Sequence, residues 1–313
     1  FFYTAISFPF IAAYDSAASI FRAQENTKGP MLISMISNAM NIVGNAIMIW
    51  IFHMGVAGAA ISTLVSRIFC AVVVLIQLRK DRQPIVVRAY LKIRPDWAMI
   101  RRILGIGIPS GVENGMFQFG KLAIQSTVST MGTTAIAAQA MTNILENVNG
   151  VFGIGTGIGL MTVVGQCIGA KHYKEAKYYM VKLTVIAEVG LTISCLLVYA
   201  AAHPVTLIAG MEAESAALCM QMIAAITIVK PVAWVLSFVP AYGLRAAGDV
   251  RFSMIVSVTT MWCCRVALCI FLVKAFGMGP MALWSGMFAD WSIRSVIFSG
   301  RFLSGRWLKK AMN

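Results

Sequence analysis

Long apolar runs constrain the fold of this chain more than any other feature of its sequence. About 20 apolar residues in a helix cross the hydrocarbon of a bilayer, and a helix is required because unpaired backbone polar groups are not tolerated in lipid. Hydrophobic residues make up 59% of the 313 residues and charged residues only 12%, whereas soluble domains contain about 25% charged residues. The sequence therefore predicts an all-α polytopic membrane protein with nine transmembrane helices, at approximately 2–22, 31–52, 55–78, 103–130, 135–166, 178–202, 215–242, 252–274 and 279–300.

An internal repeat relates the two ends of the sequence. The segment Phe21–Met31 aligns with Leu244–Met254, at an offset of 223 residues. Each copy follows an apolar helix that has a proline in its interior, Pro9 or Pro231. We expect both helices to bend there, because proline removes a backbone hydrogen bond. Duplication of a whole helical half is typical of secondary transporters.

The same offset predicts the domain organisation. Ile103 opens the first helix of the second copy, and its counterpart would fall before the first residue. We therefore expect the chain to be the C-terminal part of a twelve-helix transporter with two six-helix lobes, lacking about three helices. Residues 1–78 would be the last helices of the first lobe, 79–102 a cytoplasmic linker, and 103–313 the complete second lobe with a short cytoplasmic tail. Transport by this chain alone is not expected, because the cavity would lie open to lipid.

The net charge of +14 reflects membrane topology rather than nucleic-acid binding. Most of the 26 lysines and arginines lie at every second junction between the apolar runs. The other junctions contain a single basic residue of this kind, Lys274. This positive-inside pattern places Phe1 outside the cell and Asn313 in the cytoplasm. The seven cysteines form no CxxC pair, so no metal site or disulfide framework is predicted. We expect a monomeric, multi-pass protein of the plasma membrane that uses no cofactor.

Ionisable residues inside the apolar runs are the candidate site, because a charge at mid-span costs at least about 2.5 to 3.5 kcal/mol. Glu113 follows Pro109 by one helical turn, and the proline leaves the carbonyl of Gly105 without its helical donor. A carboxylate beside this loosened backbone can hold a proton or Na⁺. The alternative is a structural salt bridge between Glu113 and Lys121 or Lys230. Lys230 would then be either a counter-ion in the coupling machinery or a paired structural residue.

Polar stripes at helical spacing form a second group of candidates. Such stripes either line an aqueous cavity or join helices by hydrogen bonds. For Glu146 we favour the cavity, since a helix contact does not need a charge, and this residue joins Glu113 and Lys230 as a candidate for cation or proton coupling. The candidate cavity-lining residues are Asp15, Asn38, Asn41, Asn114, Gln139, Asn143 and Asn147.

The repeated motif itself lies in cytoplasmic turns. Arg22 and Arg245 occupy equivalent positions. Anchoring at the cytoplasmic surface is a sufficient explanation for both, and closing contacts between helices on that side is a second one. Gly248 and Asp249 complete the second copy. Asp249 and its counterpart Asn26 precede apolar helices, where their side chains suit N-caps.

Four segments, taken together and in order, resemble the second lobe of the multidrug and toxic compound extrusion (MATE) family: Ile106-Gly107-Ile108-Pro109, Gly165-Gln166-Cys167-Ile168-Gly169-Ala170, Gly243-Leu244-Arg245-Ala246-Ala247-Gly248-Asp249 and Arg301-Phe302-Leu303-Ser304-Gly305-Arg306-Trp307. The resemblance implies an antiporter that exports organic cations, drugs or other amphipathic compounds by alternating access, driven by Na⁺ or H⁺ entry. In that family an acidic residue on the seventh helix contributes to cation binding, and Glu113 lies on that helix. Some members also use an acidic residue on the tenth helix, where this chain has Lys230.

Other functions are less well supported by the residues. A lipid-linked saccharide flippase of the same superfamily would be expected to have a more cationic cavity. A membrane-embedded enzyme would need a catalytic constellation, and the three histidines lie near helix ends without HExxH spacing. The glycine-rich stretch 153–159 is no dinucleotide-binding loop, because no strand precedes it; we expect it to permit close helix packing.

Overall fold

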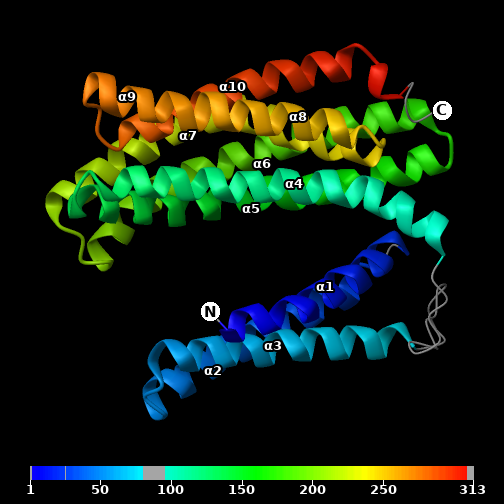
Figure 1. Cartoon of the computed structure of the whole chain (residues 1–313), viewed down its shortest axis with the longest axis horizontal. Coiled ribbons are helices and arrows are strands. Elements are labelled where there is room, and N and C mark those ends of the chain that lie inside the picture. Colours follow the sequence, from blue (N-terminus) through cyan, green and yellow to red (C-terminus); the bar gives the residue numbers. More distant parts are fainter. Residues whose placement is uncertain (1, 25, 80–95, 309–313) are drawn as a thin grey trace. The chain divides into compact units, whose positions relative to one another are not determined.

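The computed structural model describes residues 2–24, 26–79 and 96–308, and these consist of helices and turns without a strand. They form two compact units, within residues 1–95 and 96–313. The helices are α1 (Phe2–Ala23), α2 (Lys28–Ala46), α3 (Gly55–Leu78), α4 (Trp97–Ser129), α5 (Thr133–Gly169), α6 (Tyr173–Ile208), α7 (Ala213–Ala246), α8 (Val250–Thr260), α9 (Leu268–Phe276) and α10 (Met281–Leu303), with π-helical segments η1 (Ile47–Ile51) and η2 (Met261–Ala267) (Figure 1).

The helices fit a polytopic membrane protein, as the sequence predicts. In the described ranges, nine continuous helical segments lie at the positions of the nine predicted spans. Six of these segments are long and apolar enough to cross a membrane: Lys28–Ile51, Gly55–Leu78, Thr133–Gly169, Tyr173–Ile208, Ala213–Ala246 and Val250–Phe276. For the other three, α1, α4 and α10, crossing of the membrane stays a prediction.

The predicted linker lies largely outside the described residues. Its last part, however, is helical, because α4 begins at Trp97 rather than at Ile103. Asp96 caps this helix, and its Oδ1 accepts hydrogen bonds from the backbone N–H groups of Ala98 and Met99 at 2.9 and 3.2 Å. A side chain that satisfies two free N–H groups at a helix start fixes where the helix begins.

In unit 1, α3 packs against both α1 and α2. Its small core contains Ala17 and Phe21 of α1, Ile33 of α2, and Val74 and Leu78 of α3. Pro9 lies inside α1, which continues through it. The widened π-helical turn η1 closes the second helix of this unit.

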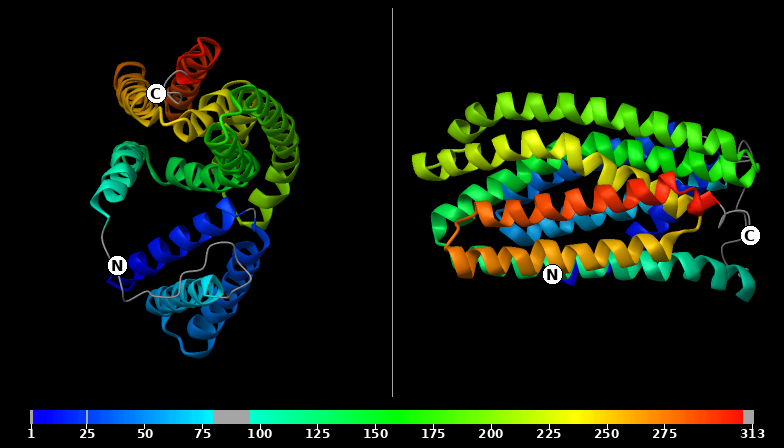
Figure 2. Two further views of the ribbon diagram at one scale, coloured as in Figure 1. Left: turned by 90° about the vertical axis from the view of Figure 1, so that its right-hand side faces the viewer. Right: turned by 90° about the horizontal axis from the view of Figure 1, so that it is seen from above.

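In unit 2, the central helix is α7, which packs against α5, α6 and α10. The main core lies among these four helices and includes the large buried side chains Trp284, Trp291 and Leu191. Outside this core, α4 packs along α8. Figure 2 shows the helices of unit 2 from the end and from above. Pro109 and Pro231 lie inside α4 and α7, and both helices continue through them.

The two copies of the repeat share a backbone hydrogen bond. The N–H of Asn26 donates to the carbonyl of Phe21 at 3.0 Å, and the N–H of Asp249 donates to the carbonyl of Leu244 at 2.9 Å. Both bonds close the C-terminal turn of a helix, as in a Schellman motif. Gly248 has a φ of +80° in the second copy, a conformation that glycine adopts without steric cost. The sequence repeat is therefore also a repeat of local structure.

Glycines on one face of α5 let α7 approach closely. A Cβ at Gly153 would lie 2.5 Å from the ring of Trp234, and one at Gly157 would lie 2.5 Å from the ring of Tyr242. On the opposite face, Gly155 and Gly159 meet nothing within 4 Å. The predicted role of this stretch in helix packing therefore holds for alternate glycines.

We expect Gly157→Ala to destabilise the protein by about 1 to 3 kcal/mol, because its new methyl group would overpack the contact with Tyr242. Gly155→Ala is the matched control, since it adds the same methyl group to open space and should be neutral or stabilising by up to about 1 kcal/mol. Thermal unfolding of the two variants in detergent micelles measures the difference. Equal unfolding temperatures would contradict the close packing of α5 on α7.

Candidate functional site

Glu113 on α4 forms an ion pair with Arg245 in the last turn of α7. The Nη2 group of Arg245 donates a 2.6 Å hydrogen bond to Oε1 of Glu113. Glu113 is only 7% exposed, and its second oxygen, Oε2, is buried and accepts no hydrogen bond from the residues that the structure describes. One carboxylate oxygen is thus held by a cation, whereas the other can accept a proton or coordinate a cation.

This pairing differs from the one proposed on sequence grounds. Neither Lys121 nor Lys230 is the partner of Glu113. Lys121 instead lies over the ring of Phe117 on its own helix, 5.3 Å from the centroid. The positive-inside rule is sufficient to explain Arg245 as a surface anchor, but the structure agrees with the second interpretation, a contact between helices. Its guanidinium in fact reaches a buried carboxylate and also lies 5.6 Å from the ring centroid of Tyr242.

Lys230 on α7 is bound to Glu146 on α5. Its Nζ donates to Oε1 of Glu146 at 2.6 Å and to the backbone carbonyl of the same residue at 3.0 Å. The ammonium group also lies 5.4 Å from the ring centroid of Trp234. Lys230 is 0% exposed, and a buried ammonium is tolerated when a carboxylate and further polar or aromatic groups surround it. The pair therefore joins α5 to α7.

The polar stripe on α5 is divided between helix contacts and exposed surface. Gln139 is buried; its Oε1 accepts a 3.0 Å hydrogen bond from Nε1 of Trp284 on α10, and its Nε2 donates to Asn143 at 3.2 Å. Asn147 is exposed. On α4, Asn114 is also exposed, and its Nδ2 donates to the carbonyl of Ser110 at 2.9 Å. Gln139 thus joins two helices, and the cavity-lining role of the stripe stays a prediction.

A second buried charge cluster lies between α8, η2 and α10. Nη1 of Arg294 is 3.7 Å from Oδ2 of Asp290, and its Nη2 donates to Oγ of Ser257 at 2.8 Å. Arg265 donates to the sulfur of Met287 at 3.1 Å and forms no ion pair with the described residues. Asp290, Arg265 and Arg294 are charges inside the apolar runs of the sequence, but their own sequence context assigns them no role.

The turn of the second repeat copy holds a further ion pair. Asp249 is fully buried and occupies the predicted N-cap position of α8, but its side chain makes no capping hydrogen bond there. Its Oδ2 accepts hydrogen bonds from Nε and Nη2 of Arg301 on α10, at 2.8 and 2.7 Å. In the first copy, Arg22 donates to Ser19 on its own helix at 3.0 Å. The prediction of Asn26 as an N-cap is wrong by one residue, because Thr27 occupies the N-cap of α2; the side chain of Asn26 accepts a 3.4 Å hydrogen bond from the N–H of Gly29.

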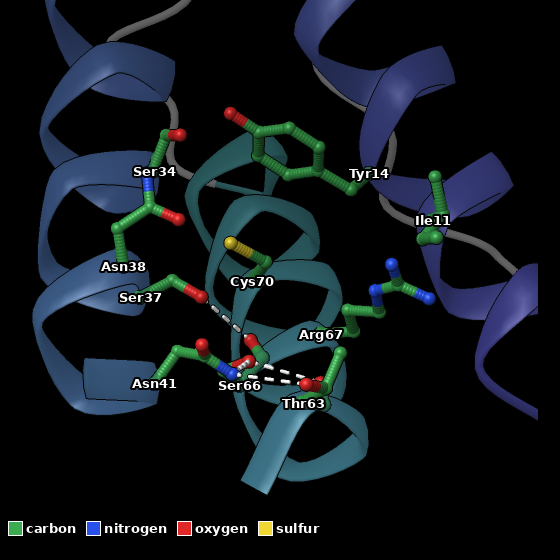
Figure 3. Close-up of a pocket in the computed structure, with 10 residues that line it drawn as sticks. All are labelled: Ile11, Tyr14, Ser34, Ser37, Asn38, Asn41, Thr63, Ser66, Arg67 and Cys70. Atoms are coloured by element: carbon green, nitrogen blue, oxygen red, sulfur yellow. Dashed lines mark hydrogen bonds between the residues drawn. The ribbon is translucent and has the colours of Figure 1, made fainter. Parts of the chain in front are cut away.

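Unit 1 contains a polar cavity of about 280 Å³ between its three helices (Figure 3). Asn38 and Asn41 of α2 line it, together with Arg67 of α3. Asn41 donates to Thr63 at 3.2 Å, so it also joins α2 to α3, while Arg67 extends towards α1 (Figure 3) and donates to Ser7. Asp15 is exposed on α1 and is not part of this lining. Among the described residues, no group of three or more His, Cys, Asp or Glu could hold a metal ion.

We expect Glu146→Gln and Lys230→Met each to destabilise the protein by about 3 to 5 kcal/mol, because each leaves one buried charge without its partner. The double variant should recover much of this loss, since it removes both charges. A double-mutant cycle on thermal unfolding measures the coupling. Lys182→Met with Glu146→Gln is the matched control and should give additive effects, because Lys182 is an exposed lysine of α6 that lies over the ring of Tyr178. Additive losses for the Glu146 and Lys230 pair would show that the two residues do not interact.

Comparison with known proteins places the chain in a family. The sequence profile of the MatE family matches residues 109–271, and that of the lipid II flippase MurJ matches residues 1–94. The chain is 25% identical over 303 residues to the probable multidrug resistance protein NorM of Thermotoga maritima, covering 94% of this chain and 64% of that protein. It is 22% identical to the probable multidrug resistance protein YoeA of Bacillus subtilis, covering 96% of this chain and 66% of that protein.

Solved structures show the same fold. The outward-facing conformation of a multidrug resistance MATE family transporter of the MOP superfamily has a TM-score of 0.83 and 18% identity, over 95% of this chain and 66% of that one. A MOP superfamily transporter from Pyrococcus furiosus has a TM-score of 0.81 and 18% identity, over 96% of this chain and 67% of that one. This chain thus spans about two thirds of the length of the proteins that it matches. Because the MatE profile covers more than half of the sequence, the chain belongs to the MatE family.

Proposed function

We propose that this protein acts as a secondary antiporter of the plasma membrane, which exports organic cations, drugs or other amphipathic compounds by alternating access. Entry of Na⁺ or H⁺ drives the export, and the C-terminus lies in the cytoplasm. The observation that carries the proposal is the ion pair of Glu113 with Arg245. Its support from relatives is the description of NorM and YoeA as probable multidrug resistance proteins.

The pair of Glu113 and Arg245 suits a site that exchanges cations. A proton or Na⁺ that binds the carboxylate competes with the guanidinium for the same negative charge, so binding weakens the link between α4 and α7. When the cation leaves, the ion pair reforms and the helices are joined again. An equilibrium between two helix arrangements can be shifted only by a ligand that binds one of them better. A cation that replaces Arg245 at Glu113 has that property.

The test measures uptake of a fluorescent organic cation into everted vesicles from cells that express the full-length protein, under an imposed gradient of Na⁺ or of H⁺. We expect driven uptake by the protein and its loss in Glu113→Gln, because the amide retains the size of the carboxylate but cannot take up a cation. The control is Glu188→Gln. Glu188 is a half-buried carboxylate of α6 that forms no ion pair with the described residues, so its variant should transport normally.

Several outcomes would contradict the proposal. Unchanged uptake by Glu113→Gln would remove Glu113 from the coupling path. Equal loss in Glu188→Gln would indicate a general effect of removing membrane carboxylates. Absence of uptake under both gradients would contradict multidrug export itself.

A second function, translocation of a lipid-linked saccharide, is supported by two observations. The MurJ profile matches residues 1–94, and Arg265 in unit 2 is a buried cation without an ion-pair partner among the described residues. The Nε–H group of Arg265 is also buried and donates no hydrogen bond to the described residues. A buried unpaired charge is costly, and the phosphate of a lipid-linked saccharide would neutralise it.

If this second function is correct, reconstituted protein should translocate a fluorescent lipid-linked saccharide across vesicle membranes, and Arg265→Gln should slow the translocation about tenfold, as expected for one lost charge-assisted contact of about 1.5 kcal/mol. Arg306→Gln is the control, since Arg306 is exposed after the end of α10. Drug uptake without saccharide translocation would favour the antiporter. The reverse result would favour the flippase.

A further inference from the structure

A crevice opens on the surface of unit 2 where α4 and α8 begin. These two helices lie side by side (Figure 1), and the crevice measures about 570 Å³, within the range of roughly 300 to 1,000 Å³ that is typical of ligand pockets. It does not include Glu113, Arg245, Lys230 or Glu146. The residues that form its wall and rim include Trp97, Arg101, Leu104, Gly105, Ile108 and Arg251.

The rim of the crevice carries positive charge. Arg101 follows the first turn of α4, and Arg251 lies in the first turn of α8, so both stand at the same end of neighbouring helices. Both are exposed, and neither forms an ion pair with another residue in the described part of the chain. Trp97, which is 74% exposed, lies beside them at the start of α4. Trp and Arg at a helix end are typical of the level of the lipid headgroups.

The wall of the crevice becomes apolar with depth. Leu104, Gly105 and Ile108 follow Arg101 along α4, and Ile108 lies about 10 Å further along the helix axis at 1.5 Å per residue. A Cβ at Gly105 would meet nothing within 4 Å, so this part of the wall is open. The crevice therefore combines a cationic rim with an apolar channel that leads towards the middle of the membrane.

We propose that this crevice binds an anionic phospholipid. The phosphate lies between Arg101 and Arg251, because guanidinium groups bind phosphate oxygens through paired hydrogen bonds. One acyl chain follows the apolar wall past Gly105. Basic pockets between transmembrane helices on the cytoplasmic side are suited to anionic headgroups. The positive-inside pattern of the sequence puts this end of α4 and α8 on that side.

The test is lipid binding by the purified chain in detergent, followed by native mass spectrometry. The probes are phosphatidylglycerol and phosphatidylcholine with identical acyl chains, and inorganic phosphate. We expect phosphatidylglycerol to be retained in preference to phosphatidylcholine, and inorganic phosphate not to displace it. Arg101→Gln and Arg251→Gln should each weaken retention of phosphatidylglycerol about fivefold, the effect of one basic residue at a charged membrane surface.

Matched controls separate the headgroup contact from the acyl-chain contact. Arg102→Gln removes a neighbouring exposed arginine that is not part of the crevice, and its binding should not change. Gly105→Phe should abolish lipid retention by filling the channel. Gly107→Phe places the same ring at a second open position of α4 outside the lining, and it should retain the lipid. Both phenylalanine variants point into open space, so thermal unfolding should show that both fold.

Equal retention of the two lipids would overturn the proposal, as would a loss in Arg102→Gln as large as that in Arg101→Gln. Displacement by inorganic phosphate would show a site for a free anion rather than for a lipid. Each of these results is distinct from a failure of transport, because lipid binding is measured without a gradient or a transported compound.

Discussion

The pairing of buried charges between helices is the constraint on which the arrangement of unit 2 depends. In a membrane, an isolated charge inside a span is costly, and a polar partner on another helix lowers that cost. Here α7 supplies two cations, and each reaches a carboxylate on a different neighbour: Lys230 binds Glu146 of α5, and Arg245 binds Glu113 of α4. The same helix is the centre of the apolar core, where it packs on α5, α6 and α10. Displacement of α7 would therefore disturb both ion pairs and the core together, which makes it the helix through which a change at Glu113 can reach the rest of the unit.

The two ion pairs differ in what they allow. Nζ of Lys230 has two hydrogen bonds to a single residue and lies against an aromatic ring, with no exposure. Such a group is held in place and suits a permanent joint between helices. Arg245 is partly exposed, and the second oxygen of Glu113 is buried without a partner among the described residues. Because this oxygen of Glu113 is free to accept, a cation can bind it and weaken the ion pair with Arg245.

The sequence predicted the helices well because apolar runs and the repeat are properties of the chain itself. It identified Glu113, Glu146 and Lys230 as charges that need an explanation, since composition alone makes a charge within an apolar run conspicuous. It could not identify their partners, because spacing along the chain says which residues share a face of one helix but not which face meets a neighbour. Glu113 and Arg245 are 132 residues apart, and Lys230 and Glu146 are 84 apart. For Arg245, the positive-inside rule already explains a basic residue at a helix end, so the sequence gives no specific reason to expect its contact with Glu113. The role of Asp249 was predicted only as an N-cap, whereas its pairing with Arg301 depends on the approach of α10.

The position of Lys230 bears on how cations could be coupled in this chain. The MATE resemblance implies that some members use an acidic residue on the helix that corresponds to α7, but in this chain that helix presents an ammonium group. A cation cannot share a site with a buried lysine that is already neutralised by Glu146. The carboxylate of Glu146 is in turn occupied, through Oε1, by the same lysine. Glu113 differs from Glu146 in its ion-pair partner. The partner of Glu113 is a partly exposed arginine, whereas the partner of Glu146 is a fully buried lysine. The charge of Lys230 therefore has a structural explanation in its pairing with Glu146, whereas Glu113 stays the candidate for coupling in this unit.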